Sequence, residues 1–317
     1  MKIPLPRLIA ATGTKRRRFV IRNREPLKRD RDRLLSIYLR VVRHWEAAIP
    51  RIVEAYERNA RADGLLTDSN EVAVSRASVT DTAEDIVTEA IDSEASWFER
   101  VFFDLRILVA DWAGYVEAYQ RSRWTKTIFS ATGVELDTLL EAGDVSMTVR
   151  ERIAANLELV RDVNAQQRQR MVQAVYSGYS QRLSAREIAK ELQAVTGFGR
   201  KRALLIASNE LTTLVSQLDR ERMHQAGVTE FVWRHSGKLH PRAWHKARNG
   251  KRYSLETRKQ SDGNGDEVIP KDDMFGVPIR CGCVGDSWLD LDAMERELEA
   301  NGELMSQEEL DRLMASE

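Results

Sequence analysis

The sequence predicts a mainly α protein, with an elongated helical N-terminal half followed by a small α+β module that holds a short-stranded sheet or hairpin. Apolar residues recur at helical spacing over most of the chain before Gly227, and beyond it the pattern becomes strand-like. The 317 residues, 42% of them hydrophobic and 31% charged, suffice for a buried core. We expect two domains, or one domain with long arms.

Three long helices are expected in the N-terminal half. The first begins at Pro26 and runs to about residue 60, and Pro50 should kink or break it because proline lacks a backbone N–H. The second covers residues 88–120, and the third runs from about residue 149 to residue 179. The apolar line of the second helix consists of Trp97, Val101, Leu105, Val109 and Trp112. Between the first two helices, the polar segment 61–81 is typical of a loop.

Two further helices are expected before the module. Ser184 and Glu187 have the spacing of a capping box at the start of the first, which should end at Gly197 and Gly199. A longer amphipathic helix follows and runs to about Gly227. On this helix Glu210 lies on a partly apolar line, where a carboxylate needs a hydrogen-bonding or cationic partner unless it sits at a solvated edge.

The C-terminal module begins where the pattern becomes strand-like. Residues 230–236, "EFVWRHS", alternate large apolar and polar side chains and end at a Ser-Gly turn. A short helix should start near Pro241 and end at the turn pair Asn249 and Gly250, followed by a brief strand. The glycine-rich, polar segment 258–273 is expected to be a loop or the tip of a hairpin.

The net charge of zero conceals an opposite sign at the two ends. Residues 2–33 carry twelve basic and three acidic side chains, whereas beyond Asp286 there are ten acidic and two basic ones. We therefore expect a basic arm over residues 1–25, for a polyanion or an acidic protein surface, and an acidic helical tail over residues 286–317. Solvated helix ends are the alternative. The arm residues expected to make such contacts are Lys15, Arg16, Arg17, Arg18, Arg22 and Arg24.

No stretch approaches the roughly 20 apolar residues that a membrane span needs. The basic cluster near the start follows a weak apolar patch, whereas a secretory signal places its positive charges first. We therefore expect a protein without a membrane partner that works where it is made. The only cysteines, Cys281 and Cys283, are too close in sequence for an unstrained disulfide, so reduced thiols are expected.

The two cysteines lie downstream of a cluster of histidines. In an extended segment, residues i and i+2 point the same way, so Cys281 and Cys283 can present both sulfurs to one point. With His245 and either His240 or His235 they would form a zinc site of four ligands. Because structural zinc sites favour two to four residues between paired cysteines, buried thiols that pack the hairpin against the preceding helix are the alternative.

Three motifs in order, "RALLIASNEL", "VWRHSGKLHPRAWHKARNGKRY" and "VPIRCGC", resemble the phage head morphogenesis family, the Mu F-like minor head proteins. The matching positions are Ile206, Ala207, Asn209, Glu210, Trp233, His245, Gly250, Pro278, Cys281 and Cys283. Asn209 stands where that family usually has threonine, Arg280 and Gly282 replace the asparagine and arginine of its closing "P-x-N-C-R-C", and the usual aspartate before the histidine is missing. The resemblance covers residues 184–285, about a third of the chain.

The resemblance implies a minor capsid protein of a tailed bacteriophage, found in the virion inside the head and, during assembly, in the host cytoplasm. It implies the portal protein as partner, and possibly packaged double-stranded DNA and the major capsid or scaffolding protein. No enzymatic activity is expected, and no cofactor apart from a possible zinc ion. In this interpretation residues 26–145 form a helical docking domain and residues 146–285 the head morphogenesis domain.

Two other classes of protein remain open. A hydrolase would use Cys281 as nucleophile with His245 as base, or a zinc-activated water with Glu210 as base. Against it, the sequence has no phosphate-binding glycine loop, no "HExxH" and no "GxSxG" motif. A nucleic-acid-binding protein would use the basic arm, with salt-dependent affinity and no sequence specificity, because no base-reading motif is present.

Overall fold

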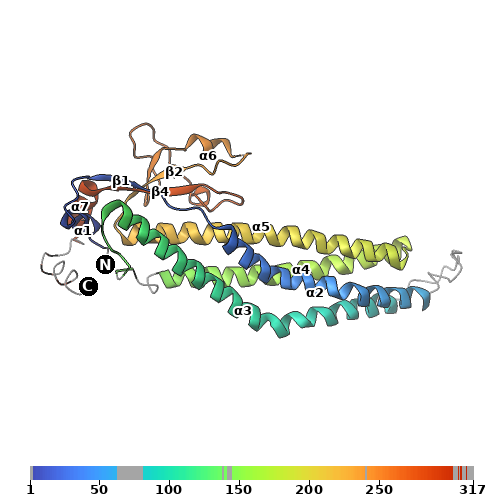
Figure 1. The fold of residues 1–317 in the computed structure, drawn as a ribbon. Helices are drawn as coiled ribbons and strands as arrows, with labels where there is room; N and C mark the ends of the chain where they lie inside the picture. The colour runs from blue at the N-terminus through green and yellow to red at the C-terminus, as the bar shows by residue number, and fades with distance from the viewer. Residues whose placement is uncertain are drawn as a thin grey trace. The chain divides into compact units, whose positions relative to one another are not determined.

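The computed structural model describes residues 3–62, 81–137, 139–140, 145–239 and 241–302, and residues 306, 308 and 312. Long helices are followed by a small antiparallel sheet and a C-terminal helix, which confirms the predicted fold class (Figure 1). The elements are α1 (Leu5–Ala11), β1 (Arg18–Ile21), α2 (Lys28–Ala62), α3 (Asp81–Thr132), α4 (Ser146–Gln181), α5 (Ala185–Gln225), β2 (Glu230–Arg234), α6 (Ala243–Ala247), β3 (Arg252–Ser254), the 3-10 helix η2 (Lys271–Asp273), β4 (Val284–Asp290) and α7 (Leu291–Ala300). Most of the predicted loop 61–81 lies outside the described residues.

The chain folds into two compact units, each assembled from stretches that are far apart in sequence. Unit 1 comprises Met1–Leu27, Ala113–Arg152 and Asn209–Glu317, and unit 2 comprises Lys28–Trp112 and Ile153–Ser208. No helix in the described part of the chain combines the length and the apolarity that crossing a membrane needs.

The predicted segment boundaries at residues 25, 145 and 285 differ from this division. Residues 1–25, expected as a separate basic arm, contribute α1 and β1 to unit 1. The reason is that this segment carries apolar side chains such as Leu5 and Phe19, which are buried in the core of unit 1. The tail expected to be helical from residue 286 continues strand β4 to Asp290 before α7 begins.

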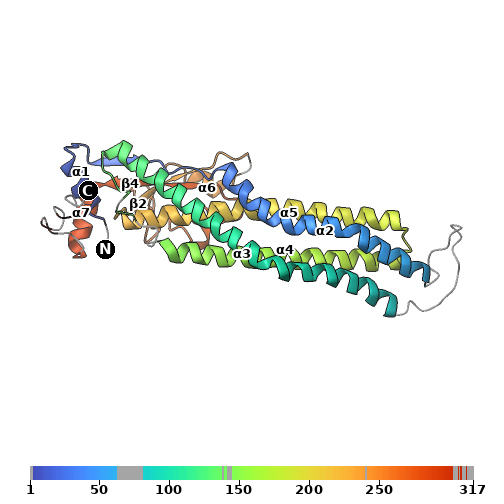
Figure 2. The same ribbon diagram turned by 60° about the horizontal axis from the view of Figure 1, so that its bottom comes forward.

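Unit 2 contains α2 and parts of α3, α4 and α5, which run alongside one another (Figure 2). Buried polar contacts tie α2 to α4, including a hydrogen bond from the Trp45 indole to Asn164 Oδ1 at 2.9 Å. The prediction that Pro50 kinks or breaks the first helix was wrong in one respect, because α2 runs unbroken past it. Trp45, Ile52 and Tyr56 are buried on either side of the proline. Their packing outweighs the roughly 3 kcal/mol that an internal proline costs.

Helix α5 begins as predicted but does not end where predicted. The capping box forms, with the Ser184 N–H donating to Glu187 Oε2 at 2.8 Å and the Glu187 N–H donating to Ser184 Oγ at 3.4 Å. Gly197 and Gly199 do not end the helix, which continues to Gln225. Gly199 is needed for another reason: a β-carbon there would lie 2.5 Å from the Gln167 side chain.

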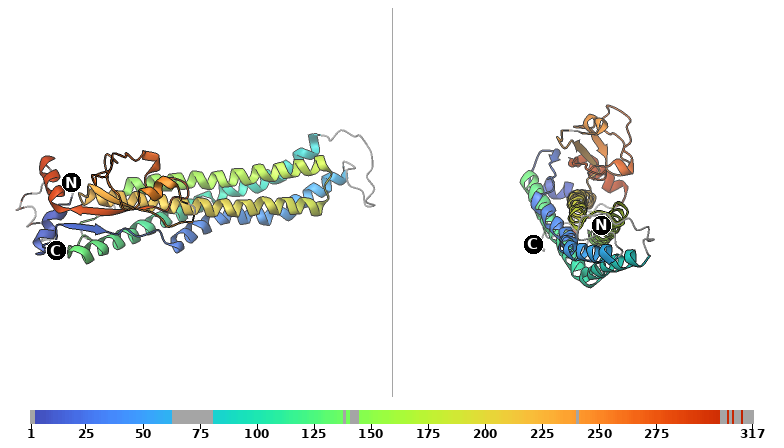
Figure 3. Two further views of the ribbon diagram at one scale, coloured as in Figure 1. Left: turned by 90° about the horizontal axis from the view of Figure 1, so that it is seen from above. Right: turned by 90° about the vertical axis from the view of Figure 1, so that its right-hand side faces the viewer.

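The sheet of unit 1 has the strand order β1-β4-β2-β3, with all neighbours antiparallel. In Figure 3 the blue strand β1 lies beside the red strand β4. The register places Phe231 opposite both Ser287 and Tyr253, and Phe19 opposite Leu289. The alternation of large apolar side chains turns one face of the sheet towards a core that includes Leu5, Ile9, Phe19, Ile21, Phe231, Trp233, Tyr253, Phe275 and Leu289. Strands β2 and β3 and helix α6 were predicted, whereas β1 and β4 were not.

Candidate metal centre

The two cysteines and one histidine meet in the core of unit 1. Cys281 and Cys283 lie in the extended segment that leads into β4, and His245 lies on α6. The His245 Nδ1 atom is 3.7 Å from Cys281 Sγ and 3.6 Å from Cys283 Sγ. The side chains are nearly inaccessible, with exposed fractions of 2% for His245, 5% for Cys281 and 2% for Cys283.

These distances fit zinc coordination. A tetrahedral zinc ion, with bonds of about 2.05 Å to nitrogen and about 2.3 Å to sulfur, places those two ligand atoms about 3.6 Å apart. A histidine nitrogen has a single lone pair and accepts one hydrogen bond. Two sulfurs at nearly equal distance from one Nδ1 atom therefore fit a shared ion better than two S–H···N hydrogen bonds.

Asp273 orients the histidine ring. Its Oδ1 atom lies 2.8 Å from His245 Nε2, and an ionised carboxylate can only accept, so Nε2 carries the proton and Nδ1 presents its lone pair to the sulfurs. Partial burial alone would raise the pKa of Asp273, but hydrogen bonds from His245 and Arg248 outweigh it and hold this pKa below its usual value. A carboxylate behind the ligating histidine is the usual arrangement at zinc sites.

The two thiols share one strongly polarised environment. A hydrogen bond from Cys283 lowers the pKa of Cys281 to about 5, although burial opposes this shift. The pKa of Cys283 is raised, because its proton stabilises the neighbouring thiolate and because the site is buried. The hydrogen bond between the two sulfurs therefore favours ionisation of one thiol of the pair, and zinc binding would displace the protons that the ligating sulfurs still carry.

Gly282 lets the "CGC" segment pass close to the turn after β2. A β-carbon at this position would lie 3.0 Å from the Ser236 β-carbon and 2.9 Å from Lys238 Cε. The same Lys238 donates from Nζ to the Arg280 carbonyl at 2.7 Å, which closes the turn over the glycine. This packing explains why the residue between the cysteines is glycine here.

The other motif residues hold the segment that carries the cysteines. Asn209 on α5 accepts a hydrogen bond through Oδ1 from the Arg280 N–H at 2.9 Å, and Arg280 has a positive φ of 61°. The Pro278 carbonyl accepts from the Cys281 N–H at 2.8 Å. Both bonds order the turn immediately before the "CGC" segment.

Trp233, Gly250 and Glu210 complete the motif. The Trp233 ring packs edge-on against His245, with centroids 5.1 Å apart, and the Trp233 carbonyl accepts from the Gly250 N–H at 2.8 Å. Gly250 adopts a φ of 81°, which favours glycine. Glu210 is largely buried and lies 3.6 Å from Arg152, the cationic partner that its position requires.

Of the four predicted zinc ligands, the structure brings three together. His240 lies outside the described residues. His235, the alternative ligand, accepts from the Gly237 N–H through Nδ1 at 3.1 Å, whereas its Nε2 atom is buried without a hydrogen-bond partner among the described residues and stays a candidate ligand atom. Sequence reasoning missed Asp273, because the polar loop that holds it shows no spacing that links it to His245.

The predicted contact residues near the N-terminus fall into two groups. Arg17 pairs with Asp292 at 2.7 Å and Arg18 pairs with Asp290 at 2.9 Å. Lys15 and Arg16 are exposed, and the Arg16 guanidinium lies over the Phe19 ring. Arg22 and Arg24 are also exposed and line a hollow that is described below. The two oppositely charged ends of the chain therefore partly neutralise each other within unit 1.

No protein-family model matches the sequence, and neither a curated protein nor a solved structure is similar to it.

Proposed function

We propose that this chain is a minor head protein of a tailed bacteriophage, bound to the portal inside the head and assisting head assembly and DNA packaging or ejection. One observation carries the proposal: several of the motif residues that resemble the head morphogenesis family lie around a single cluster. Asn209 holds the turn before the cysteines, Trp233 packs on His245, and His245 contacts both sulfurs. Residues that matched a sequence motif by chance would not be expected to lie close together in the folded chain.

The metal centre in this proposal is structural. A zinc ion held by His245, Cys281 and Cys283 would tie α6 to the segment entering β4, and its binding free energy would then be folding free energy. The near-complete burial of the three side chains fits this role, because a catalytic zinc ion needs an open position that a substrate can reach.

Elemental analysis of the chain, purified under reducing conditions without chelator, tests the centre. We expect one zinc ion per chain, and we expect Cys281→Ser and His245→Gln to lose it and to melt at a lower temperature. His224→Gln, at an exposed histidine of α5, is the matched control and should keep the metal, whereas His235→Gln and His240→Gln report which of these two histidines is the fourth ligand. Folded protein without zinc would instead make the thiols packing groups.

Purified phage heads test the role in the virion. With a tagged copy in the phage or prophage that encodes the chain, we expect it in purified heads at a few copies and in complexes with the portal protein. Infectious heads that assemble and package DNA without the chain would contradict the proposal. The result does not depend on whether zinc is bound.

A cysteine hydrolase is the second candidate. The arrangement of Cys281, His245 and Asp273 favours it, since the candidate nucleophile Cys281 and the orienting carboxylate of Asp273 both contact the ring of His245, the candidate base. Its weakness is access, because Cys281 is only 5% exposed. Rapid alkylation of Cys281 by iodoacetamide in the folded, metal-free protein would support the hydrolase, whereas protection of this thiol supports the structural role.

A further inference from the structure

Unit 1 contains a hollow of about 530 Å³ that is lined by cations from two elements. Its lining residues are Val20, Ile21, Arg22, Arg24, Tyr119, Arg123, Lys126, Thr127, Ser130 and Ala131, and we call it the basic pocket. Arg22 and Arg24 come from the segment that follows β1, and Arg123 and Lys126 come from α3.

The local sequence pattern points these side chains into one space. Around Arg22 and Arg24 the chain alternates exposed and buried residues, so the two arginines share a face of an extended segment. On α3, Tyr119, Arg123 and Lys126 recur at steps of four and three residues and so share a helix face. The Arg123 guanidinium lies 5.3 Å from the centroid of the Tyr119 ring, a cation–π contact that positions it.

The charge of the pocket is unbalanced. The chain carries 49 basic and 49 acidic residues, yet no carboxylate is among the ten lining residues. Among the described residues, none of the four cations forms an ion pair, in contrast to Arg17 and Arg18, which bind the acidic segment at the start of α7. The carboxylates of Asp219 and Asp286 are near enough to attract Arg123 and Arg22, respectively, but neither carboxylate lines the hollow. The four cations that do line it repel one another, and a bound anion relieves that repulsion.

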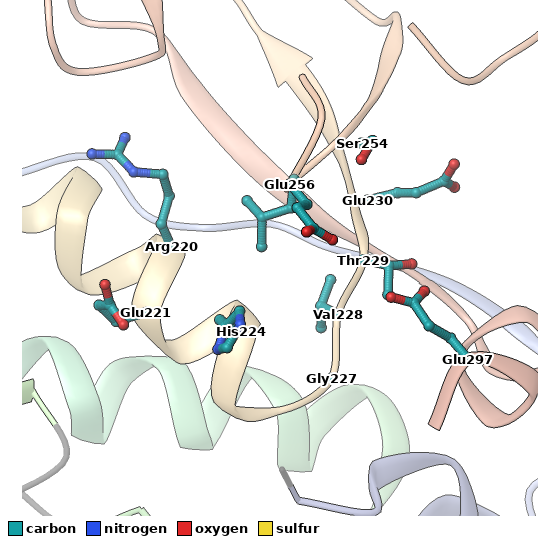
Figure 4. A pocket seen from close by; sticks show the side chains of 11 residues that line it. Arg220, Glu221, His224, Gly227, Val228, Thr229, Glu230, Ser254, Glu256 and Glu297 are labelled. Carbon is teal, nitrogen blue, oxygen red and sulfur yellow. The ribbon is translucent and has the colours of Figure 1, made fainter. Parts of the chain in front are cut away.

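A second hollow of unit 1 differs from the basic pocket in the charge of its lining. It has a volume of about 640 Å³, and four glutamates contribute to its lining (Figure 4). These are Glu221, Glu230, Glu256 and Glu297. Arg220 and His224 also line it, but the glutamates outnumber them, so of these two hollows the basic pocket is better suited to a negatively charged ligand.

We propose that the basic pocket binds phosphate groups of a nucleic-acid backbone, with Arg22, Arg24, Arg123 and Lys126 as the contacts. Arginine presents a planar fork of donors that matches the oxygens of a phosphate, and the Ser130 hydroxyl adds a neutral donor. No base-reading motif is present in the sequence, so binding should not depend on the DNA sequence. The inference rests on the proposed function for the source of the nucleic acid, packaged duplex DNA.

Salt-dependent binding of the full chain to a fluorescent random-sequence duplex, measured by anisotropy, tests the inference. Each lost phosphate contact should lower the slope of log K against log salt by about 0.9 and weaken binding about tenfold near 0.1 M salt. Arg123→Gln/Lys126→Gln should therefore lose about two units of slope. Arg186→Gln/Lys190→Gln removes the same charge from exposed positions on α5 and should keep the wild-type slope. Equal melting temperatures establish that both variants fold.

Three outcomes would overturn the inference. An equal loss in both double variants means that overall charge, not the pocket, attracts DNA. Displacement of the duplex by polyglutamate at equal charge concentration means that the ligand is an acidic protein surface. Absence of binding at about 50 mM salt, where phosphate contacts are strong, excludes the site outright. Portal association is measured separately, so failure of the proposed function and failure of this inference are distinguishable.

Discussion

Gly276 shows how a single residue without a side chain positions the loop beside the cluster of His245, Cys281 and Cys283. Its φ is +76°, and a β-carbon would lie 1.9 Å from Ser216 Oγ and 3.2 Å from the Thr212 carbonyl on α5. The Gly276 carbonyl accepts a hydrogen bond from Thr213 Oγ1 at 3.1 Å. The loop that carries Asp273 therefore approaches α5 more closely than any other residue at position 276 would permit.

Gly276→Ala should destabilise unit 1 by about 2–5 kcal/mol, the sum of about 1–2 for the positive φ and about 1–3 for overpacking. Gly250→Ala is the matched control, since its φ is +81° and nothing lies within 4 Å of its β-carbon position. It should cost only the conformational part, about 1–2 kcal/mol. Urea unfolding of both variants measures the difference, and equal losses would refute the packing argument.

Asp219 is a fully buried carboxyl on α5 that accepts a hydrogen bond from Gln120. Burial raises its pKa to about 7, although Gln120, Arg220 and Arg123 act in the opposite direction. Between the ordinary aspartate pKa near 4 and pH 7, the folded state binds more protons than the unfolded state. The free energy of unfolding should therefore fall as pH rises through this window, by up to about 1.4 kcal/mol per unit.

Asp219→Asn should remove this pH dependence, because the amide keeps an acceptor for Gln120 and does not ionise. We expect the variant to be more stable than the wild type at pH 8 and to show a flatter profile between pH 4 and pH 7. Denaturant unfolding at several pH values measures both. A wild-type profile in the variant would show that another group causes the dependence.

At the scale of elements, alanine substitutions at two glycines of α5 should change the stability of unit 2 in opposite directions. Gly197 has open space around its β-carbon position, whereas a β-carbon at Gly199 would meet the buried Gln167 side chain at 2.5–3.0 Å. Gly197→Ala should stabilise unit 2 by about 0.5–1 kcal/mol, because alanine has the better helix propensity. Gly199→Ala should destabilise it by about 1–3 kcal/mol through overpacking. Thermal or urea unfolding of the pair measures this, and a gain at both sites would contradict the contact with Gln167.

At the scale of the whole molecule, the first segment of the chain is part of the core and not a detachable arm. Deleting residues 1–24 removes buried apolar side chains, among them Leu5, Ile9, Phe19 and Ile21, and the strand that pairs with β4. Burial of these four stabilises by about 6–12 kcal/mol, comparable to the whole stability of a typical domain. The deletion should therefore unfold unit 1, seen as lost amide protection in β4.

Charge changes are the proper probe of this segment. Lys15→Gln/Arg16→Gln alters only exposed side chains and should leave the amide protection of β4 unchanged. A truncated chain that unfolds cooperatively with wild-type stability would show that α1 and β1 are dispensable.

The sequence by itself predicted the mainly α fold class, the strands and short helix after Gly227, and the capping box at Ser184. These features depend on local periodicity and on side-chain contacts within a few residues, which a chain reveals without its fold. It also predicted His245, Cys281 and Cys283 as a group, because residues i and i+2 of an extended segment share a face.

The strand pairing and the complete surroundings of the candidate sites were decided only by the tertiary structure. The pairing of β1 with β4 joins segments about 270 residues apart, and no local pattern specifies such a partner. Asp273 behind His245, and Arg123 and Lys126 opposite Arg22, are likewise juxtaposed by folding. Gly197 and Gly199 were expected to end a helix, but α5 continues through both. The burial of the flanking side chains outweighs the weak preference of glycine against the helix interior.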